Sequence, residues 1–445
     1  MPTLTNKDVK IAQKHLKMKQ KMITSPCLRV DADLIIPGRG QPIKNGSLIS
    51  SDAKIILVCK TDILGPEHAK IPPITVPVLM PGMWDCHMHF MGVEKTAVDD
   101  MVMVPPAIAG ARSAKDIVAT LNAGFTSVRE LAGYGSDLSK VISEGWLPGP
   151  NIYPAVSILS QTAGHGDAHS LPLNLLNDRM RHGLPFYLCD GVGECIKAVR
   201  IQIRRGAKVI KVATTGGVLS LIDDPQMQQF SAKELEAIVE EATRSDRIVA
   251  AHCHGRKGIM AALRAGCRTI EHGSYLDQEA IELMLEMNAI LVPTRSIIEY
   301  GLQHAEAFTK ESYAKMIKVS EAHKKSYQLA VNAGIRIALG TDLGFSSPTI
   351  RFNHGMNGGE FRYAVDAGMT SLEAIEAGTA NGPETLGLQA PKSGQLKPGY
   401  DADFIALSGN PMKDIDILAD PGKVTHVWKA GHLHKSPTKP CGLLT

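Results

Sequence analysis

Short apolar runs alternate with segments of helical periodicity over most of the chain. A first strand, entered through Pro81 and Gly82 after the apolar run 74–80, is followed by seven apolar runs at 126–130, 151–159, 208–213, 248–253, 269–271, 290–293 and 336–339. Between most of them, apolar residues recur at helical spacing, at 113–122, 193–205, 231–245, 255–265, 278–286 and 305–333, and again after the last strand at 371–380. Strands that alternate with helices form a parallel sheet, and eight such units fit a closed barrel. We predict an α/β fold with a (β/α)8 TIM barrel over 80–389.

The two ends of the chain share a different pattern. Short alternating or apolar runs, separated by turns such as Asn45-Gly46 and Ala430-Gly431, occupy 28–58 and 394–429. Two ends of like character that flank a different middle predict one small β-sandwich domain, built from 27–79 and 390–445. Within 1–26, apolar residues recur at helical spacing, and we expect an N-terminal helical tail there.

The composition narrows the class of function. The chain has 445 residues and a net charge of +3 without a long basic run, so we expect no nucleic-acid partner. Its 8 cysteines form no CxxC pair, which predicts reduced thiols rather than a disulfide framework. No stretch is apolar enough to cross a membrane, and the N-terminus lacks the apolar core of a signal peptide. These features predict a soluble, cytoplasmic protein with no membrane partner, although a processed, secreted form stays open.

Two histidines stand at the end of the first predicted barrel strand. Successive side chains of a strand alternate between faces, so His87 and His89 point the same way and can share a metal ion, whereas Met88 points into packing. Active sites of (β/α)8 barrels lie at this carboxyl end of the strands. Two solvated histidines on an exposed strand would have the same spacing, so ligands from later strands must decide between the two interpretations.

Later strand ends supply those candidates. Lys211 is charged in an otherwise apolar run; burial would lower its pKa, and a neutral amine can capture carbon dioxide to become a carbamate that bridges two cations. The fifth strand ends with His252 and His254, the sixth with His272 and the eighth with Asp342. Any one of these residues could be a hydrogen-bonded core residue. Together, at the carboxyl ends of successive strands, they favour a metal centre.

With these motifs the chain resembles the metal-dependent amidohydrolase superfamily. The resemblance is carried by 81–89, Lys211, His252, Glu271-His272-Gly273, Gly340-Thr341-Asp342 and the closing run 394–403. It implies two divalent metal ions, the first bound by His87, His89 and Asp342, the second by His252 and His272, with carbamylated Lys211 between them. Imidazole and carboxylate ligands suit Zn²⁺, with manganese and iron as alternatives. Asp342 would take the proton of the attacking water and pass it to the leaving amine.

Within that superfamily, 78–90, 160–167, 203–212 and 424–429 are most similar to the fungal ochratoxinases. This similarity implies carboxypeptidase-like hydrolysis of a small-molecule amide, an N-acyl aromatic amino acid, as in the conversion of ochratoxin A to ochratoxin alpha plus L-phenylalanine. It also implies a homo-oligomer, with an octamer as the candidate assembly. Prolidase-like Xaa dipeptidases and imidazolonepropionase-like enzymes are alternatives. A mononuclear deaminase is disfavoured because a single-metal site would not need the bridge that Lys211 supplies. A non-catalytic scaffold is disfavoured because suitable residues occupy all six ligand positions.

Substrate contacts are expected from four further positions. His165 lies between glycines that allow a ligand to approach closely, and we expect it to polarise the carbonyl or bind a substrate carboxylate. His254 shares the face of His252, so we expect it to contact substrate; the alternative is a partner that orients a metal ligand. His169 and Phe345 lie on the loops 167–191 and 343–361, whose lengths depart from the family pattern. Loops of this kind vary the specificity of barrel enzymes.

One pair of opposite charges ends the second predicted strand. Arg129 and Glu130 follow an apolar run, where buried charges meet either another charge or a substrate. We expect an internal ion pair rather than a substrate contact.

Overall fold

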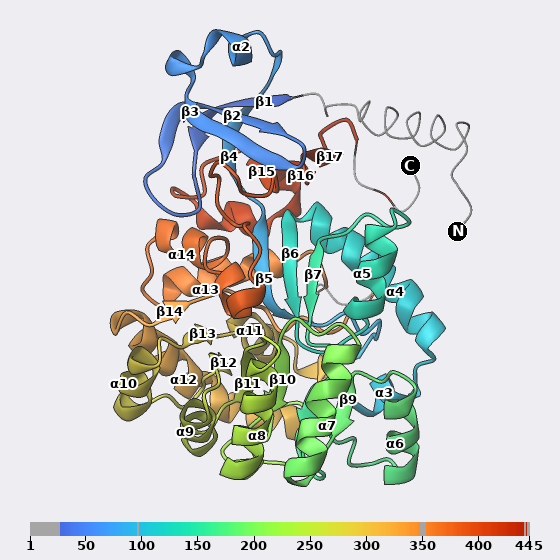
Figure 1. The fold of residues 1–445 in the computed structure, drawn as a ribbon. Coiled ribbons are helices and arrows are strands. Elements are labelled where there is room, and N and C mark those ends of the chain that lie inside the picture. The colour runs from blue at the N-terminus through green and yellow to red at the C-terminus, as the bar shows by residue number, and fades with distance from the viewer. Residues whose placement is uncertain (1–26, 96–97, 348–352, 440–441, 443–445) are drawn as a thin grey trace, which may run out of the picture.

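The computed structural model describes residues 27–95, 98–347, 353–439 and 442. The helical tail predicted for 1–26 lies outside these described residues, as does part of the loop 343–361. Figure 1 shows a sheet built from the two chain ends, next to a larger part in which strands and helices alternate. Among the described residues, no helix is long and apolar enough to cross a membrane.

Strands from both chain ends form one seven-stranded sheet in the order β17-β16-β15-β4-β1-β2-β3. Its members are β1 (Leu28–Ile35), β2 (Ile43–Ser51), β3 (Lys54–Lys60), β4 (Pro73–Pro81), β15 (Phe404–Leu407), β16 (Val424–Lys429) and β17 (His432–Lys435). The N- and C-terminal strands lie side by side in Figure 1 because β4 pairs in parallel with β1 and antiparallel with β15. Val30, Leu48, Phe404 and Trp428 belong to the apolar cluster buried in this part. The two ends therefore share a sheet, whereas the two facing layers of a sandwich are not confirmed.

The larger part is built on parallel strands. A three-stranded sheet has the order β5-β6-β7, and a seven-stranded sheet has the order β14-β13-β12-β11-β10-β8-β9. The strands are β5 (Met83–Met88), β6 (Phe125–Glu130), β7 (Asn151–Pro154), β8 (Ile158–Ser160), β9 (Phe186–Leu188), β10 (Ile210–Ala213), β11 (Val249–Cys253), β12 (Thr269–His272), β13 (Ile290–Val292) and β14 (Arg336–Ile337). All their pairings are parallel, in agreement with the predicted alternation of strands and helices.

Within the described residues, the predicted closed barrel is not one continuous ladder of hydrogen bonds. At one seam Lys208 N donates to Pro154 O (2.8 Å), and at the other Cys86 N donates to Leu339 O (2.8 Å). The predicted strand 151–159 is divided because Val156 has a φ of 75°, which is outside the extended region. The short strand β9 has no counterpart in the sequence prediction, and it pairs with β8.

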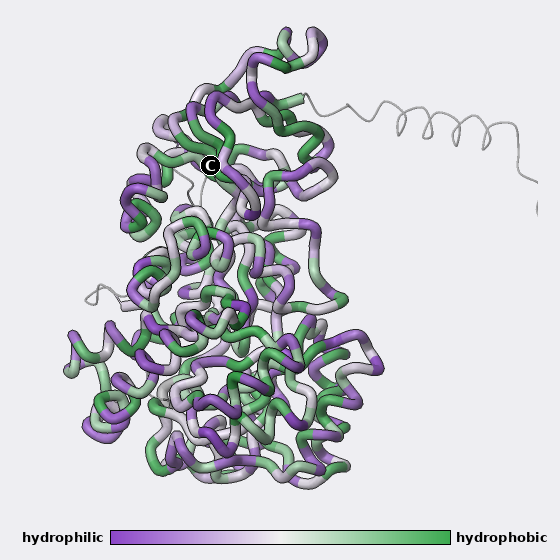
Figure 2. Tube along the Cα trace, turned by 90° about the vertical axis from the view of Figure 1, so that its left-hand side faces the viewer, coloured by the Kyte–Doolittle hydropathy of each residue, from purple (hydrophilic) through white to green (hydrophobic). Residues whose placement is uncertain are grey.

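Helices connect the parallel strands and cover them on the outside (Figure 1). The α-helices are α2 (Pro66–Ala69), α3 (Val98–Met103), α4 (Pro106–Asn122), α5 (Gly135–Ser143), α6 (Leu173–Arg181), α7 (Gly191–Arg204), α8 (Ala232–Thr243), α9 (Arg256–Ala265), α10 (Gln278–Glu286), α11 (Arg295–Gln303), α12 (Lys310–Asn332), α13 (Glu360–Asp366) and α14 (Ser371–Ala377). Short 3-10 helices are η1 (Thr61–Ile63), η2 (Ala305–Ala307), η3 (Asn357–Gly359), η4 (Pro383–Gln389), η5 (Ile415–Ala419) and η6 (Pro421–Lys423). Ser231 and Thr370 begin α8 and α14 with capping boxes. Hydrophobic stretches run through both parts of the molecule (Figure 2). One buried apolar cluster lies within the sheet of the chain ends, and a larger one joins β4, β15 and β16 of that sheet to the parallel strands and their helices.

Candidate metal centre

The candidate ligands gather at the carboxyl ends of the parallel strands. His87 lies near the end of β5, and His89 follows directly after the strand. Met88, between them, is buried in an apolar cluster with Phe90 and Val128. The predicted alternation of faces is therefore observed: the two imidazoles line one cavity, and the intervening methionine packs away from it.

Asp342 joins His87 and His89 in a first cluster, in which one ligand atom from each residue lies within 4.8 Å of the others. Asp342 Oδ1 is 3.0 Å from His89 Nε2 and 3.4 Å from His87 Nε2. Asp342 has a φ of 59°, and its backbone N donates to His87 O at 2.7 Å. His89 Nδ1 lies 2.8 Å from Ala132 O, so Nε2 is the nitrogen that faces Asp342 and can bind a metal together with it. The first cluster thus combines two imidazole nitrogens with a carboxylate.

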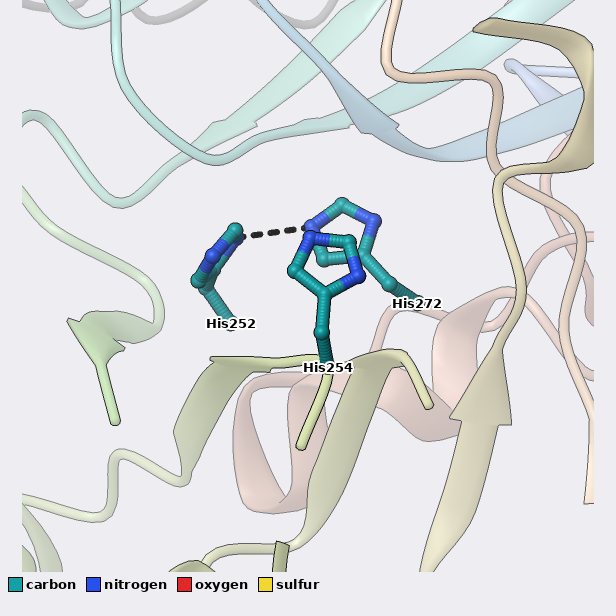
Figure 3. A group of neighbouring side chains, drawn as sticks. All are labelled: His252, His254 and His272. Atoms are coloured by element: carbon teal, nitrogen blue, oxygen red, sulfur yellow. Dashed lines mark hydrogen bonds between the residues drawn. The ribbon is translucent and has the colours of Figure 1, made fainter. Parts of the chain in front are cut away.

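His252, His254 and His272 form a second cluster, shown in Figure 3. His252 Nδ1 lies 2.9 Å from His272 Nε2, and the rings of His254 and His272 stack with centroids 4.7 Å apart. Hydroxyl groups contact the other nitrogens: Ser274 Oγ is 2.7 Å from His254 Nδ1, and Thr294 Oγ1 is 2.7 Å from His272 Nδ1. His254, which the sequence suggested as a substrate contact, therefore lies within reach of a metal held by His252 and His272.

Lys211 lies on β10, the neighbour of β11, and lines the same cavity as both clusters. Its exposed fraction is 1%, and its Nζ has no hydrogen-bond partner among the described residues. Burial lowers the pKa of this amine to about 8, against the opposing effect of Glu271 and Asp342. A buried amine without a partner is unfavourable unless another group engages it. Beside imidazole and carboxylate ligands, this orphaned amine fits a site built for divalent cations.

Glu271 supports the first cluster and was given no role from the sequence. Its side chain is fully buried, accepts two hydrogen bonds from Arg129 Nη2 (both 2.8 Å) and lies 2.9 Å from His87 Nδ1. Burial opposes the charge, but Arg129 and His87 outweigh it and lower the pKa of Glu271 to about 2. Arg129 therefore forms an internal ion pair, as expected, but with Glu271. Glu130 instead accepts hydrogen bonds from backbone N–H groups.

Four histidines of the two clusters are neutral near pH 7. Burial is the largest cause: it lowers the pKa of His87 to about 4 and that of His254 to about 3. The pKa values of His252 and His272 lie well below the usual range, because burial and neighbouring imidazoles both disfavour added charge. The pKa of Asp342 falls to about 2 because the imidazoles beside it outweigh its burial. Neutral imidazole and ionised carboxylate are the forms that bind metal cations.

Three of the four predicted substrate contacts, His165, His254 and Phe345, line the cavity beside the clusters. The ring of His165 stacks on His252 with centroids 4.1 Å apart, and its Nδ1 is 3.1 Å from Ser220 Oγ. His169 is not among the residues that line this cavity in the part of the chain that the structure describes. The structure therefore brings His165 to the candidate ligands and leaves His169 apart from them.

Apart from the polar clusters, the cavity walls are largely apolar. They are formed by side chains that include Ile158, Phe186, Val218, Ile297, Met316 and Phe345. Phe186 comes from β9, so the loop 167–191 contributes to the wall through an element that the sequence did not predict. The site can therefore hold an apolar molecule beside the candidate metal ligands.

Comparison with known proteins places this centre in a family. A model of the amidohydrolase family matches residues 78–433. The chain belongs to this family. Ochratoxinase from Aspergillus niger is 47% identical over 421 residues, which cover 91% of this chain and 86% of that protein. The crystal structure of A. niger ochratoxinase matches with a TM-score of 0.87 at 45% identity, over 94% of this chain and 97% of the other. The protein is a hydrolase that acts on amides.

Prolidases of this family also have similar structures. A prolidase crystallised with N-methylphosphonate-L-proline is 31% identical with a TM-score of 0.84, over 92% of this chain and 100% of the other. A Xaa-Pro dipeptidase with bound methionine is 29% identical with a TM-score of 0.81, at the same coverage. Amidohydrolases generally use a binuclear metal centre, and the two clusters are candidates for its ligands.

Proposed function

We propose that this protein is a binuclear metal-dependent amidohydrolase that cleaves N-acyl aromatic amino acids, converting ochratoxin A to ochratoxin alpha and L-phenylalanine. The observation that carries the proposal is the presence of two ligand clusters and the orphaned amine of Lys211 in one cavity. The 47% identity with A. niger ochratoxinase over most of both chains supports the same reaction.

The proposed ligands divide between two sites. His87, His89 and Asp342 would bind one divalent cation, His252 and His272 the other, and carbamylated Lys211 would connect them. The three-imidazole geometry of the second cluster also makes His254 a candidate ligand. The ligand types suit Zn²⁺ best. Two such cations supply Lewis acidity, which makes water a better nucleophile and the amide carbonyl a better electrophile.

Asp342 is suited to transfer the proton that amide cleavage requires. Its carboxylate faces the cavity, and its low pKa keeps it ionised, so it can accept a proton from the attacking water. It then passes the proton to the leaving nitrogen, because an amine anion is a poor leaving group. His165, at the cavity surface, is the proposed partner of the acyl oxygen or of the substrate carboxylate. His254 lines the same cavity, and a substrate contact is the alternative to its role as a metal ligand.

Specificity is proposed to come from the apolar walls. Phe345 and the aliphatic side chains around it suit the aromatic groups on either side of the scissile amide. A prolidase-like Xaa dipeptidase is the second candidate, favoured by the two prolidase-type structures at 31% and 29% identity. An imidazolonepropionase-like reaction has weaker support, because the similarity to that enzyme covers 23% of this chain.

The proposal extends to architecture and assembly. We expect a closed (β/α)8 barrel over 80–389, a β-sandwich domain from 27–79 and 390–445, and a cytoplasmic homo-oligomer such as an octamer. Light scattering after gel filtration measures the assembly directly.

A two-part assay on one preparation tests the function. Elemental analysis is expected to find about two metal ions per chain. Release of L-phenylalanine from ochratoxin A is compared with release of amino acids from Xaa-Pro and Xaa-Phe dipeptides. Preference for ochratoxin A supports the proposal, and preference for dipeptides supports the prolidase-like candidate. A protein that retains no metal after supplementation and cleaves none of these substrates would contradict both.

A further inference from the structure

We propose that a second cavity, between α11, α12 and α13, binds a free α-amino acid in its zwitterionic form. The three helices are labelled in Figure 1. The cavity has a volume of about 380 Å³, and its lining includes Arg295, Glu299, Lys324, Tyr327, Tyr363 and Asp366. None of these six residues lines the cavity of the metal centre. The volume falls in the range of small-molecule sites in proteins.

The charges of the lining match a zwitterion. Arg295 and Glu299 form an ion pair in which Nε and Nη2 contact only Oε1, at 2.8 and 2.6 Å, so Glu299 Oε2 remains an acceptor. Lys324 and Asp366 are exposed, lie on different helices and form no ion pair among the described residues. The cavity therefore presents a cation and an anion that do not neutralise each other. A carboxylate can pair with Lys324, and an ammonium group with Asp366 or Glu299.

Tyr327 contributes an aromatic ring to the cavity lining and also belongs to the buried apolar core. Its side chain is 2% exposed, and its hydroxyl has no hydrogen-bond partner among the described residues. The hydroxyl itself has almost no accessible surface, so the ring of Tyr327, and not its hydroxyl, borders the cavity. Tyr363 adds a second aromatic ring. Two rings beside separated charges suit an amino acid with an apolar side chain.

The second cavity adjoins the metal centre. Arg295 is the first residue of α11 and directly follows Thr294, which has a φ of 54° and contacts His272 Nδ1 at 2.7 Å. A ligand that contacts Arg295 or Glu299 thus acts on the turn that orients His272. If the proposed function is right, a free amino acid is also the reaction product. On that condition, occupancy of this site would regulate turnover by its own product.

Binding is measured first, without turnover, by equilibrium dialysis of L-phenylalanine against the full-length protein. Lys324→Met combined with Asp366→Asn removes the two unpaired charges at exposed positions. Lys325→Met is the matched control, because Lys325 is 73% exposed, pairs with Glu321 and does not line the cavity. Wild type and control are each expected to bind one more equivalent of L-phenylalanine per chain than the double variant. At this site 3-phenylpropionate, which lacks the ammonium group, and phenethylamine, which lacks the carboxylate, are each expected to bind about tenfold more weakly than L-phenylalanine. Equal stoichiometry in all three proteins would overturn the proposal.

Turnover of ochratoxin A is then measured in the same three proteins with and without added L-phenylalanine. A change in kcat/KM of about fivefold or more in wild type and control, absent from the double variant, supports regulation through the second cavity. An equal effect in all three proteins overturns the regulatory link, because inhibition at the metal centre would produce it. Absence of turnover contradicts the proposed function alone, since dialysis still reports on the second cavity.

Discussion

The two ligand clusters of the candidate centre differ in burial and in how they are held. All three histidines of the second cluster are buried, whereas His89 and Asp342 of the first are only half-buried. In the first cluster charged groups take part: Asp342 is ionised, and His87 contacts Glu271, which pairs with Arg129. The neutral group in this cluster is the carbonyl of Ala132, which contacts His89. In the second cluster the supporting groups are neutral, namely the hydroxyls of Ser274 and Thr294 and the carbonyl of Gly216. Both arrangements orient imidazole rings for metal binding.

The difference between charged and neutral supporting groups predicts different effects on folding stability and on the orientation of the metal ligands. Charge-assisted hydrogen bonds are about twice as strong as neutral ones, and removing one partner of a buried ion pair leaves an uncompensated charge. A hydroxyl can be removed at a lower cost to folding. Substitution of the charged groups that support the first cluster should therefore lower the free energy of unfolding. Substitution of the hydroxyl groups that support the second cluster should mainly lower metal affinity.

Lys211→Ala is expected to have the largest effect, because Lys211 is the proposed connection between the clusters. Metal content should fall below the expected value of about two ions per chain. Turnover should fall by more than roughly 100-fold, which is the upper end of the loss seen when a residue that contacts a metal ligand is replaced. Elemental analysis and steady-state kinetics measure the two effects. Lys208→Ala, at a half-buried lysine just before the same strand, is the control. Full metal content in Lys211→Ala would contradict a bridging role.

Asp342→Asn is expected to reduce kcat by about 100- to 10,000-fold, because the amide cannot take up the proton of the attacking water. The second cluster contains no side chain with this role, so His254→Asn should reduce kcat less. Single-turnover kinetics on metal-loaded protein separates loss of chemistry from loss of metal. Equal kcat losses in the two variants would argue against Asp342 as the proton carrier.

Glu271→Gln is expected to lower the free energy of unfolding by about 3–5 kcal/mol, because Arg129 keeps its charge in a fully buried position without an anionic partner. Urea denaturation of chelator-treated protein measures this loss without a contribution from bound metal. A loss below about 1 kcal/mol would show that charge is not what holds the first cluster.

The sequence predicts those parts of the centre that depend on local periodicity. The alternation of faces in a strand places His87 and His89 in one cavity, and the apolar run around Lys211 predicts its burial. These inferences need only the identity of neighbouring residues, and the structure has each of them in the predicted place.

Features that depend on contacts between distant strands could not be predicted in this way. An ion pair of Arg129 was expected, but its partner Glu271 lies 142 residues further along the chain, and nothing in the local pattern links the two. Val156, whose positive φ divides a predicted strand, has a side chain typical of strands. Phe186 belongs to a strand too short to produce a periodic signal, although it lines the cavity.

Glu360 provides a pH test of the support behind the second cluster. It accepts hydrogen bonds from Arg295 N (2.9 Å) and Ser296 N (2.8 Å) at the start of α11, next to Thr294. Burial is the main cause that raises its pKa from 4.5 to about 7. Because the folded state holds this proton more tightly, the stability from Glu360 is present below pH 4.5 and is lost as pH rises through 7.

Between pH 5 and 8, the free energy of unfolding of wild type should therefore fall by roughly 2–3 kcal/mol more than that of Glu360→Gln, which cannot titrate. Urea denaturation at the two pH values measures both proteins. Parallel pH profiles would mean that Glu360 is already ionised in the fold, and that the second cluster, like the first, is supported by a charge.

Thr294→Val is expected to have the smallest effect on folding and a selective effect on metal. Valine has nearly the shape of threonine but cannot contact His272 Nδ1, so the ring loses the group that fixes its orientation. Metal affinity should fall about 10- to 100-fold, with a loss of about 1 kcal/mol in the free energy of unfolding. Thr294→Ser, which keeps the hydroxyl, should restore the affinity. The contrary outcome is that Thr294→Val destabilises the chelator-treated protein as much as Glu271→Gln does. In that outcome the strained turn at Thr294 supports folding as well as the orientation of His272. The two clusters would then differ in the chemistry of their supporting groups but not in their contribution to folding stability.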